Sequence, residues 1–143
     1  MAHSRSATTD IPSSPEELYE IVTDIDSYPE WIDGMLEAEV LESDEDGFPL
    51  RSRMLVDAKV RKLEYFLTYE HDYPERMSWV SDGGDIQQID GSYTFAADDD
   101  GMTSVTYELT IDLGFPVPGF LIRQAEKSII GSALEGLSKR AAE

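Results

Sequence analysis

The sequence predicts an α+β fold in which one curved antiparallel sheet of about seven strands wraps around a long C-terminal helix. Three observations lead to this prediction. Apolar and polar residues alternate with period two through most of 35–111, which is typical of antiparallel strands with one wet face. Residues 13–17 carry a helix-start signal. A long apolar stripe at helical spacing begins at Phe120.

The first part of the chain predicts a strand followed by two helices. Residues 3–11 alternate weakly and are expected to form the strand. Ser14 can cap the first helix, Pro15 suits its first position, and Glu17 completes a capping box. A shorter helix then carries Tyr28, Trp31 and Ile32 and is expected to end at Gly34.

Six strands follow, and one of their faces is aromatic. They are expected at 35–41, 50–60, 62–73, 77–81, 89–95 and 105–111. Acidic turns at 44–47 and 98–101 and a glycine loop at 82–85 separate several of them. In the segment 50–60, Leu50, Ser52, Met54, Val56, Ala58 and Val60 are expected to share one face. The inner face of the sheet is then expected to carry six aromatic residues: Tyr65, Tyr69, Trp79, Tyr93, Phe95 and Tyr107.

The chain ends in the long helix that the sheet is expected to surround. Its apolar stripe is expected to comprise Phe120, Leu121, Ile122, Ala125, Ile129, Ile130, Ala133, Leu134, Leu137 and Ala141. Gly131 and Gly136 lie inside it, and each costs about 1 kcal/mol of helix propensity relative to Ala. We expect such glycines to let another segment approach the helix closely.

Composition excludes several classes of function. The 143 residues favour a single domain, 1–143, and carry 30 acidic against 11 basic side chains, a net charge of −19. This acidity argues against nucleic acid and against anionic membrane surfaces. With no cysteine, and with two distant histidines, no metal site is expected; no cofactor motif occurs. With no signal peptide and no spanning helix, we expect a cytoplasmic protein without stable membrane insertion.

The aromatic inner face predicts a pocket. It carries more side-chain volume than one helix stripe can cover, so we expect a partly enclosed site with hydroxyl groups on an apolar wall. Trp31 is expected either to gate its mouth or to pack against the sheet. Residues 115–120 form either a lid or a stiff connection. The predicted lining residues are Met54, Tyr65, Leu67, Tyr69, Trp79, Tyr93, Phe95, Tyr107, Leu109, Phe120 and Ile129.

Several segments together resemble a known superfamily. Residues 24–31 look like its D-x-x-x-Y-P-x-W segment, and residues 10–19, 69–79, 91–95 and 134–143 resemble its other elements in the same order. The superfamily is the START-like, or birch-pollen-allergen-like, group, and the D-x-x-x-Y-P-x-W segment is similar to its bacterial polyketide cyclase/dehydrase branch. The resemblance implies the helix-grip fold and a hydrophobic-ligand cavity between the sheet and the long helix. Trp31 and the lack of cysteine depart from its coenzyme Q-binding and ribosome-toxin branch.

Candidate catalytic groups are few. His71 could act as a general base, with Tyr69 beside it on the same face. Adjacent strand residues point to opposite faces, so Glu70 and Asp72 are not placed to orient that imidazole, which favours a structural role. Arg53 could hold an anion, but alternation with Met54 places it on the outer surface.

The leading hypothesis is therefore a carrier or sensor that binds a hydrophobic, lipid- or polyketide-like small molecule. One alternative is an enzyme, namely a polyketide cyclase, aromatase or dehydrase. Another is a protein-interaction module that works through an exposed apolar patch. The sequence leaves the ligand and the oligomeric state open.

Overall fold

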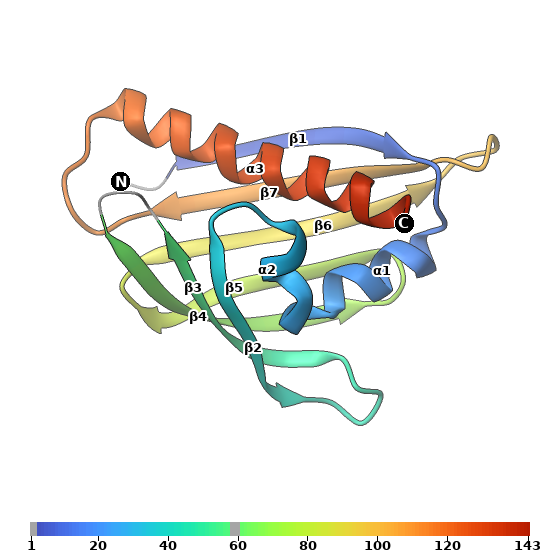
Figure 1. The fold of residues 1–143 in the computed structure, drawn as a ribbon, viewed down its shortest axis with the longest axis horizontal. Coiled ribbons are helices and arrows are strands. Elements are labelled where there is room, and N and C mark those ends of the chain that lie inside the picture. The colour runs from blue at the N-terminus through green and yellow to red at the C-terminus, as the bar shows by residue number, and fades with distance from the viewer. Residues whose placement is uncertain (1–2, 58–60) are drawn as a thin grey trace.

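The computed structural model describes residues 3–57 and 61–143, and its elements follow the predicted order. The first strand is followed by two helices with a short 3-10 turn between them, then six strands and the long helix (Figure 1). The α+β helix-grip prediction is confirmed. The elements are β1 (His3–Ile11), α1 (Pro15–Thr23), η1 (Ile25–Ser27), α2 (Tyr28–Trp31), β2 (Met35–Ser43), β3 (Pro49–Asp57), β4 (Lys62–Asp72), β5 (Arg76–Gly84), β6 (Gln88–Ala97), β7 (Thr103–Asp112) and α3 (Gly119–Ala141).

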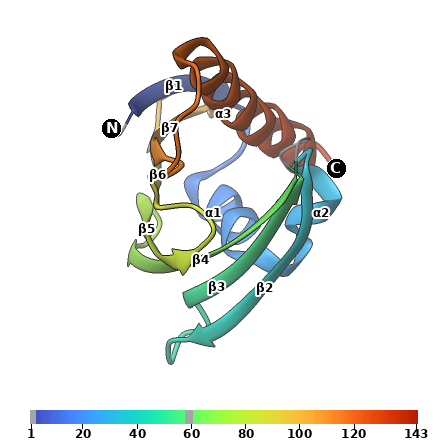
Figure 2. The same ribbon diagram turned by 90° about the vertical axis from the view of Figure 1, so that its left-hand side faces the viewer.

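The seven strands form one antiparallel sheet in the order β1-β7-β6-β5-β4-β3-β2. Strands β2 to β7 each pair with their chain neighbours, whereas β1 crosses the sheet to pair with β7. The sheet is strongly curved, and α1, α2 and α3 all lie on its concave side (Figure 2). The concave side is therefore the inner face on which a site can form.

The predicted helix cap at Ser14 forms. The Ser14 Oγ accepts a hydrogen bond from the Glu17 backbone N–H at 3.2 Å, and the Ser14 hydroxyl lies 3.0 Å from Glu17 Oε1. This cap fixes the start of α1 directly after β1. Leu18, Tyr19 and Val22 are then fully buried against the sheet.

Strand β5 is longer than predicted. It continues through the expected loop as far as Gly84, which pairs with Tyr65 on β4. Gly84 has φ +108°, and a Cβ there would lie 2.5 Å from the Glu64 carbonyl oxygen, so only glycine fits. Hydrophobic alternation cannot reveal a strand at residues without side chains. The first half of β5, from Arg76 to Trp79, pairs with both β4 and β6. The second half pairs with β4 alone.

The strand β3 differs from the prediction near its start. Ser52 and Met54 are buried on the predicted face, but Leu50, close to the start of the strand, is 37% exposed. Ala58 and Val60 lie outside the described residues. The middle of β3 therefore supplies the core, as alternation predicts.

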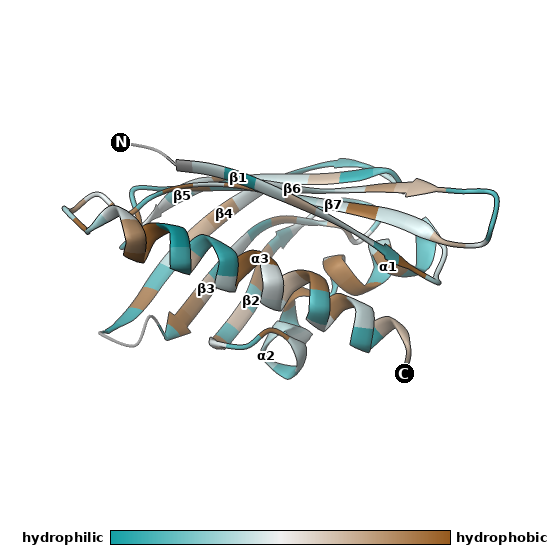
Figure 3. Cartoon of the chain, turned by 90° about the horizontal axis from the view of Figure 1, so that it is seen from above, coloured by the Kyte–Doolittle hydropathy of each residue, from teal (hydrophilic) through white to brown (hydrophobic). Residues whose placement is uncertain are grey.

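Helix α3 crosses the concave side of the sheet (Figure 3). Its buried residues differ in part from the predicted stripe. Ile130, Leu134 and Leu137 are buried as expected. Phe120 and Leu121 are 61% and 43% exposed, because the first turn of the helix extends past the part of α3 that packs on the core. The buried face instead starts at Glu126, a residue that the apolar pattern leaves out.

The two helix glycines differ in their surroundings. The backbone carbonyl of Trp31 occupies the place that a Cβ at Gly136 would need, so the predicted close approach is confirmed there. Nothing lies within 4 Å of the corresponding point at Gly131. Of the two roles expected for Trp31, the structure supports packing, with contacts made to Gly136 of α3 and to Tyr28, whose ring it meets edge-on at 5.3 Å.

Candidate functional site

The inner face of the sheet carries a continuous aromatic wall. Tyr69, Trp79, Tyr93 and Tyr107 come from the four neighbouring strands β4, β5, β6 and β7. The ring centroids of Trp79 and Tyr93 are 5.6 Å apart, those of Trp79 and Tyr107 5.7 Å, and those of Tyr93 and Tyr107 4.9 Å. These tilted and edge-to-face contacts are the favoured geometries for aromatic pairs. The four residues therefore form one connected surface, which we call the aromatic wall.

Gly91 makes the aromatic wall possible. It lies opposite Trp79 in the register of β5 and β6, and a Cβ there would lie 2.6 Å from the Trp79 ring atom Cζ2. The indole therefore extends over the bare backbone of the next strand. A larger residue at position 91 would push the ring out of the wall.

Most of the predicted lining residues lie on the inner face of the structure. Ile129 is half-buried against the core, and Phe120 is 61% exposed in the first turn of α3, away from the buried residues. Contact of any of these residues with a ligand stays a prediction. The predicted lining residues that are buried are Met54, Tyr65, Leu67, Tyr69, Trp79, Tyr93, Phe95, Tyr107 and Leu109.

Three phenol hydroxyls on this face make no hydrogen bond with the described residues: those of Tyr65, Tyr93 and Tyr107. They are not among the fully enclosed polar atoms that lack a partner, so part of each hydroxyl oxygen remains accessible. Tyr69 differs, because its hydroxyl lies 2.7 Å from Ser52 Oγ. Buried polar groups are nearly always bonded to protein, water or ligand. The three hydroxyls are therefore available to a molecule on the aromatic wall.

The charge state of these phenols follows from their burial. Desolvation raises the pKa of Tyr65, Tyr93 and Tyr107 well above 10. Burial also raises the pKa of Tyr69, and the hydrogen bond between the Tyr69 and Ser52 hydroxyls offsets part of that rise. Each phenol stays protonated at neutral pH and can both donate and accept a hydrogen bond. The wall is polar at defined points without carrying charge.

His71 is held by two structural hydrogen bonds. Its Nε2 lies 2.5 Å from the Pro49 carbonyl oxygen, which can only accept, so Nε2 carries a hydrogen. Its Nδ1 lies 2.7 Å from the Tyr19 hydroxyl. Both ring nitrogens are therefore engaged, and no hydrogen bond joins the ring to Glu70 or Asp72. Tyr19, which sequence reasoning missed as a partner, lies 52 positions away in the chain.

Arg53 lies on the outer face, as predicted. Its Nε is 2.6 Å from Glu64 Oε2, and its Nη1 is 3.2 Å from Glu37 Oε1 and 3.3 Å from Glu39 Oε1. The hydrogen bonds to Glu64 and Glu37 raise the pKa of the guanidinium. Three carboxylates already surround this cation, so it is not free to hold an anionic ligand.

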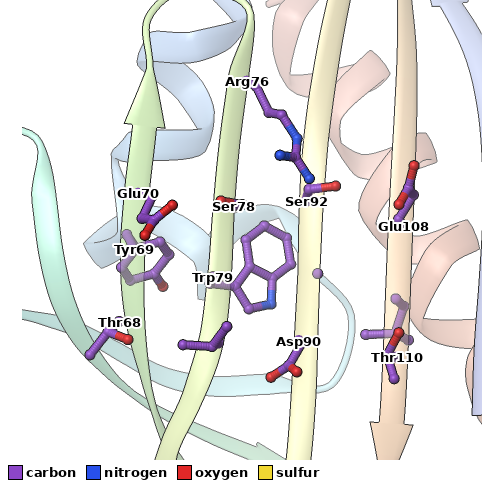
Figure 4. A pocket seen from close by; sticks show the side chains of 13 residues that line it. Thr68, Tyr69, Glu70, Arg76, Ser78, Trp79, Asp90, Ser92, Glu108 and Thr110 are labelled. Atoms are coloured by element: carbon purple, nitrogen blue, oxygen red, sulfur yellow. The ribbon is translucent and has the colours of Figure 1, made fainter.

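An open depression of about 460 Å³ lies on the outer face of β4–β7 (Figure 4). Its polar lining includes Glu70, Asp90 and Glu108, and the Arg76 guanidinium is directed towards Ser92. Binding sites for apolar molecules are mostly lined by apolar groups. Its polar lining does not suit an apolar ligand, but Tyr69, Trp79 and Leu109 of the predicted lining also border the depression, so it adjoins the predicted site.

Glu126 is a buried carboxylate that sequence reasoning missed. It is 3% exposed, and its Oε2 is fully enclosed without a hydrogen-bond partner among the described residues. The signal was its position four residues before Ile130 and eight before Leu134, inside the apolar stripe of α3. A charged residue within an apolar helical stripe indicates that the buried face of the helix carries a polar group.

The described residues offer neither a metal site nor a membrane-spanning helix. Within residues 3–57 and 61–143, no group of three His, Asp or Glu side chains is placed to hold a metal ion. None of the helices in this part of the chain is long and apolar enough to cross a membrane.

Solved structures share this fold over nearly the whole chain. A START superfamily protein from Mycobacterium smegmatis has a TM-score of 0.88 at 19% identity, with 98% of this chain and 97% of that chain covered. A protein from Thermus thermophilus has a TM-score of 0.81 at 26% identity, with 98% and 97% covered. The Zhui aromatase/cyclase from Streptomyces sp. R1128 has a TM-score of 0.80 at 12% identity, with 99% and 94% covered.

The sequence itself adds a family assignment. No curated protein sequence shows significant similarity to the chain. A family profile described as polyketide cyclase/dehydrase and lipid transport matches residues 11–138, from the last residue of β1 to near the end of α3. Because this match includes the aromatic wall and most of α3, the chain belongs to the polyketide cyclase/dehydrase and lipid transport family.

Proposed function

We propose that the protein binds a hydrophobic, lipid- or polyketide-like small molecule between the concave face of the sheet and α3, as a carrier or sensor. The observation that carries this proposal is the aromatic wall, together with the hydroxyls of Tyr65, Tyr93 and Tyr107, which have no partner among the described residues. An apolar wall with a few convergent polar groups is the usual composition of a small-molecule site. Membership of a family described by polyketide chemistry and lipid transport supports the same class of ligand.

The wall would recognise such a molecule in two ways. The rings of Trp79, Tyr93 and Tyr107 offer apolar area, which favours any ligand that removes them from water. The neutral phenols offer donors to carbonyl or hydroxyl oxygens, and these directional bonds would fix the orientation of the ligand. This combination fits a molecule that is mainly apolar and carries a few oxygens.

Binding is favoured over catalysis because His71 and Arg53, the described residues that the sequence offered as a general base and an anion site, are both held by structural contacts. Both nitrogens of His71 are held, and Arg53 is surrounded by carboxylates on the other face. The cyclase, aromatase or dehydrase alternative is supported by the same fold and family match, but not by the surroundings of His71 or Arg53. An interaction module would use the exposed Phe115, Phe120 and Leu121 near the start of α3.

Native mass spectrometry of the purified protein tests the proposal. We expect a bound apolar molecule that organic solvent removes, and uptake of 2-methoxynaphthalene by the extracted protein. Tyr107→Trp should lower this uptake by filling volume on the inner face, with the circular dichroism spectrum unchanged. Glu108→Trp is the matched control, because it places a tryptophan on the outer face of the same strand.

The two variants separate the inner face from the outer depression. Reduced uptake in Tyr107→Trp alone supports the proposed site. Reduced uptake in Glu108→Trp alone would move the ligand to the outer depression, of which Glu108 is a lining residue. A protein that carries no molecule and takes up no probe would contradict the proposed function.

A further inference from the structure

Glu126 faces the same interior as the aromatic wall. It lies on α3 four, eight and eleven residues before Ile130, Leu134 and Leu137, which are all buried. Helix residues at these spacings share one face, so the carboxylate projects towards the sheet and not into solvent. The next residue, Lys127, is exposed. Glu126 is thus a charged member of an otherwise apolar buried face.

This carboxylate has no partner in the part of the chain that the structure describes. Its Oε2 is fully enclosed, and neither of its oxygens forms a hydrogen bond or ion pair with a described residue. Burial of an unpaired carboxylate is strongly unfavourable, whereas Leu or Ala would fill the same position at no such cost. Folding therefore gives no reason for a glutamate here, and a bound molecule would supply one.

The elements packed against α3 do not neutralise Glu126. Strands β1 and β7 lie against the helix, and Arg5 on β1 faces inwards because it is in register with the buried Leu109. Arg5 is half-buried and forms no ion pair with the described residues. An ion pair between Arg5 and Glu126 is the structural alternative, and the experiments on Glu126 must distinguish it from ligand binding.

We propose that Glu126 is the polar anchor of the ligand site, and that its Oε1, the carboxylate oxygen that is not fully enclosed, accepts a hydrogen bond from a hydroxyl or amine of the ligand. This inference rests on the proposed function and adds the polar group that the ligand carries. An ionised carboxylate only accepts hydrogen bonds and repels other anions. The site therefore selects amphipathic molecules with a donor and rejects free carboxylic acids of similar size.

Four naphthalene probes of similar size test this selectivity by isothermal titration calorimetry. They are 2-naphthol with a hydroxyl donor, 2-naphthylmethylamine with a cationic donor, 2-methoxynaphthalene without a donor, and the anion 2-naphthoate. We expect the two donor probes to bind roughly tenfold more tightly than 2-methoxynaphthalene, because one hydrogen bond to a charged acceptor raises affinity by about that factor. The anion should bind most weakly. The stronger of the two donor probes identifies the natural donor as hydroxyl or amine.

Three variants isolate the role of Glu126. Glu126→Leu should abolish the preference for a donor while 2-methoxynaphthalene still binds. Glu126→Gln keeps a carbonyl acceptor without charge, so the preference for the amine should fall further than that for the hydroxyl. Glu135→Leu is the control, because Glu135 lies on the same helix with a side chain that is 72% exposed, and it should leave all four affinities unchanged.

Thermal unfolding of the ligand-free protein gives a second measurement. Glu126→Leu should raise the Tm, because it removes an unpaired buried carboxylate. A fall in Tm, matched by an equal fall in Arg5→Met, would show that the two residues hold each other and would overturn the inference.

Failure of the inference and failure of the proposed function give different results. Binding of 2-methoxynaphthalene without any donor preference, or a preference that survives in Glu126→Leu, overturns the role of Glu126 and leaves the ligand site intact. Failure of all four probes to bind overturns both.

Discussion

At the scale of single residues, the Tyr19 hydroxyl connects helix α1 to the sheet. It lies 2.7 Å from His71 Nδ1 and 3.0 Å from the Arg76 carbonyl oxygen, on two strands that the helix crosses. The rings of Phe48 and Tyr73 meet the Tyr19 ring edge-on at 5.6 Å and 5.0 Å. One fully buried side chain therefore holds three separate parts of the chain together.

Tyr19→Phe tests this role. The change removes the hydroxyl but keeps the ring, so His71 Nδ1 and the Arg76 carbonyl lose a partner inside the fold. We expect the free energy of unfolding to fall by about 1–3 kcal/mol, measured by urea denaturation. Tyr73→Phe is the control, because Tyr73 is 47% exposed and should change stability little. Equal effects of the two variants would contradict the role of the Tyr19 hydroxyl.

At the scale of elements, the two glycines of α3 show how the helix is fixed against its neighbours. Gly136 is buried against the Trp31 backbone of α2. This close contact fixes the position of the C-terminal half of α3. Gly131 is exposed and has no neighbour within 4 Å of its missing Cβ. The helix therefore carries the same propensity cost twice and gains packing only at one of the two positions.

Alanine at each of these glycines should have effects of opposite sign. Gly136→Ala should lower the free energy of unfolding by about 1–3 kcal/mol, because its Cβ would overlap the Trp31 carbonyl. Gly131→Ala should raise it by about 0.5–1 kcal/mol, because only the helix propensity changes. Thermal unfolding of the two single variants measures both values. Changes in the same direction would mean that α3 does not pack on α2 as described.

At the scale of the whole molecule, the fold follows from the sequence pattern because each strand has one wet and one dry face. Period-two alternation alone assigns Tyr65, Tyr93 and Tyr107 to the inner face, and all three are buried there. The pattern fails at the end of β5, where Gly83 and Gly84 carry no side chain that could alternate.

Contacts between residues far apart in the chain could not be predicted from this alternation. The contact between Trp79 and Gly91 depends on the register of β5 against β6, which a periodic pattern does not specify. Phe120 fits the helical stripe equally well whether or not the first turn of α3 packs on the core, and the structure leaves it exposed. Glu126 was missed because a polar residue is taken as part of the wet face unless its neighbours are known.

The buried tyrosines also set how the stability of the molecule depends on pH. Burial raises the pKa of six of the seven tyrosines, with the charges of Asp72 and Asp44 adding to the effect at Tyr19. The six are Tyr19, Tyr28, Tyr65, Tyr69, Tyr93 and Tyr107. In the unfolded chain each phenol ionises near its ordinary pKa of about 10. The folded chain therefore holds these protons more tightly than the unfolded chain does.

The sign of the pH effect follows from this difference. Below about pH 10 both states are protonated and the contribution of the phenols is fully present. Above it the unfolded chain loses protons first, so each buried tyrosine lowers the free energy of unfolding by up to about 1.4 kcal/mol per pH unit. We expect a steep, cooperative alkaline transition in which phenolate absorbance and loss of circular dichroism coincide. Phenolate absorbance that rises for these six residues while the fold persists would mean that the inner face admits water freely, and that its phenols are not the desolvated donors on which the proposed site depends.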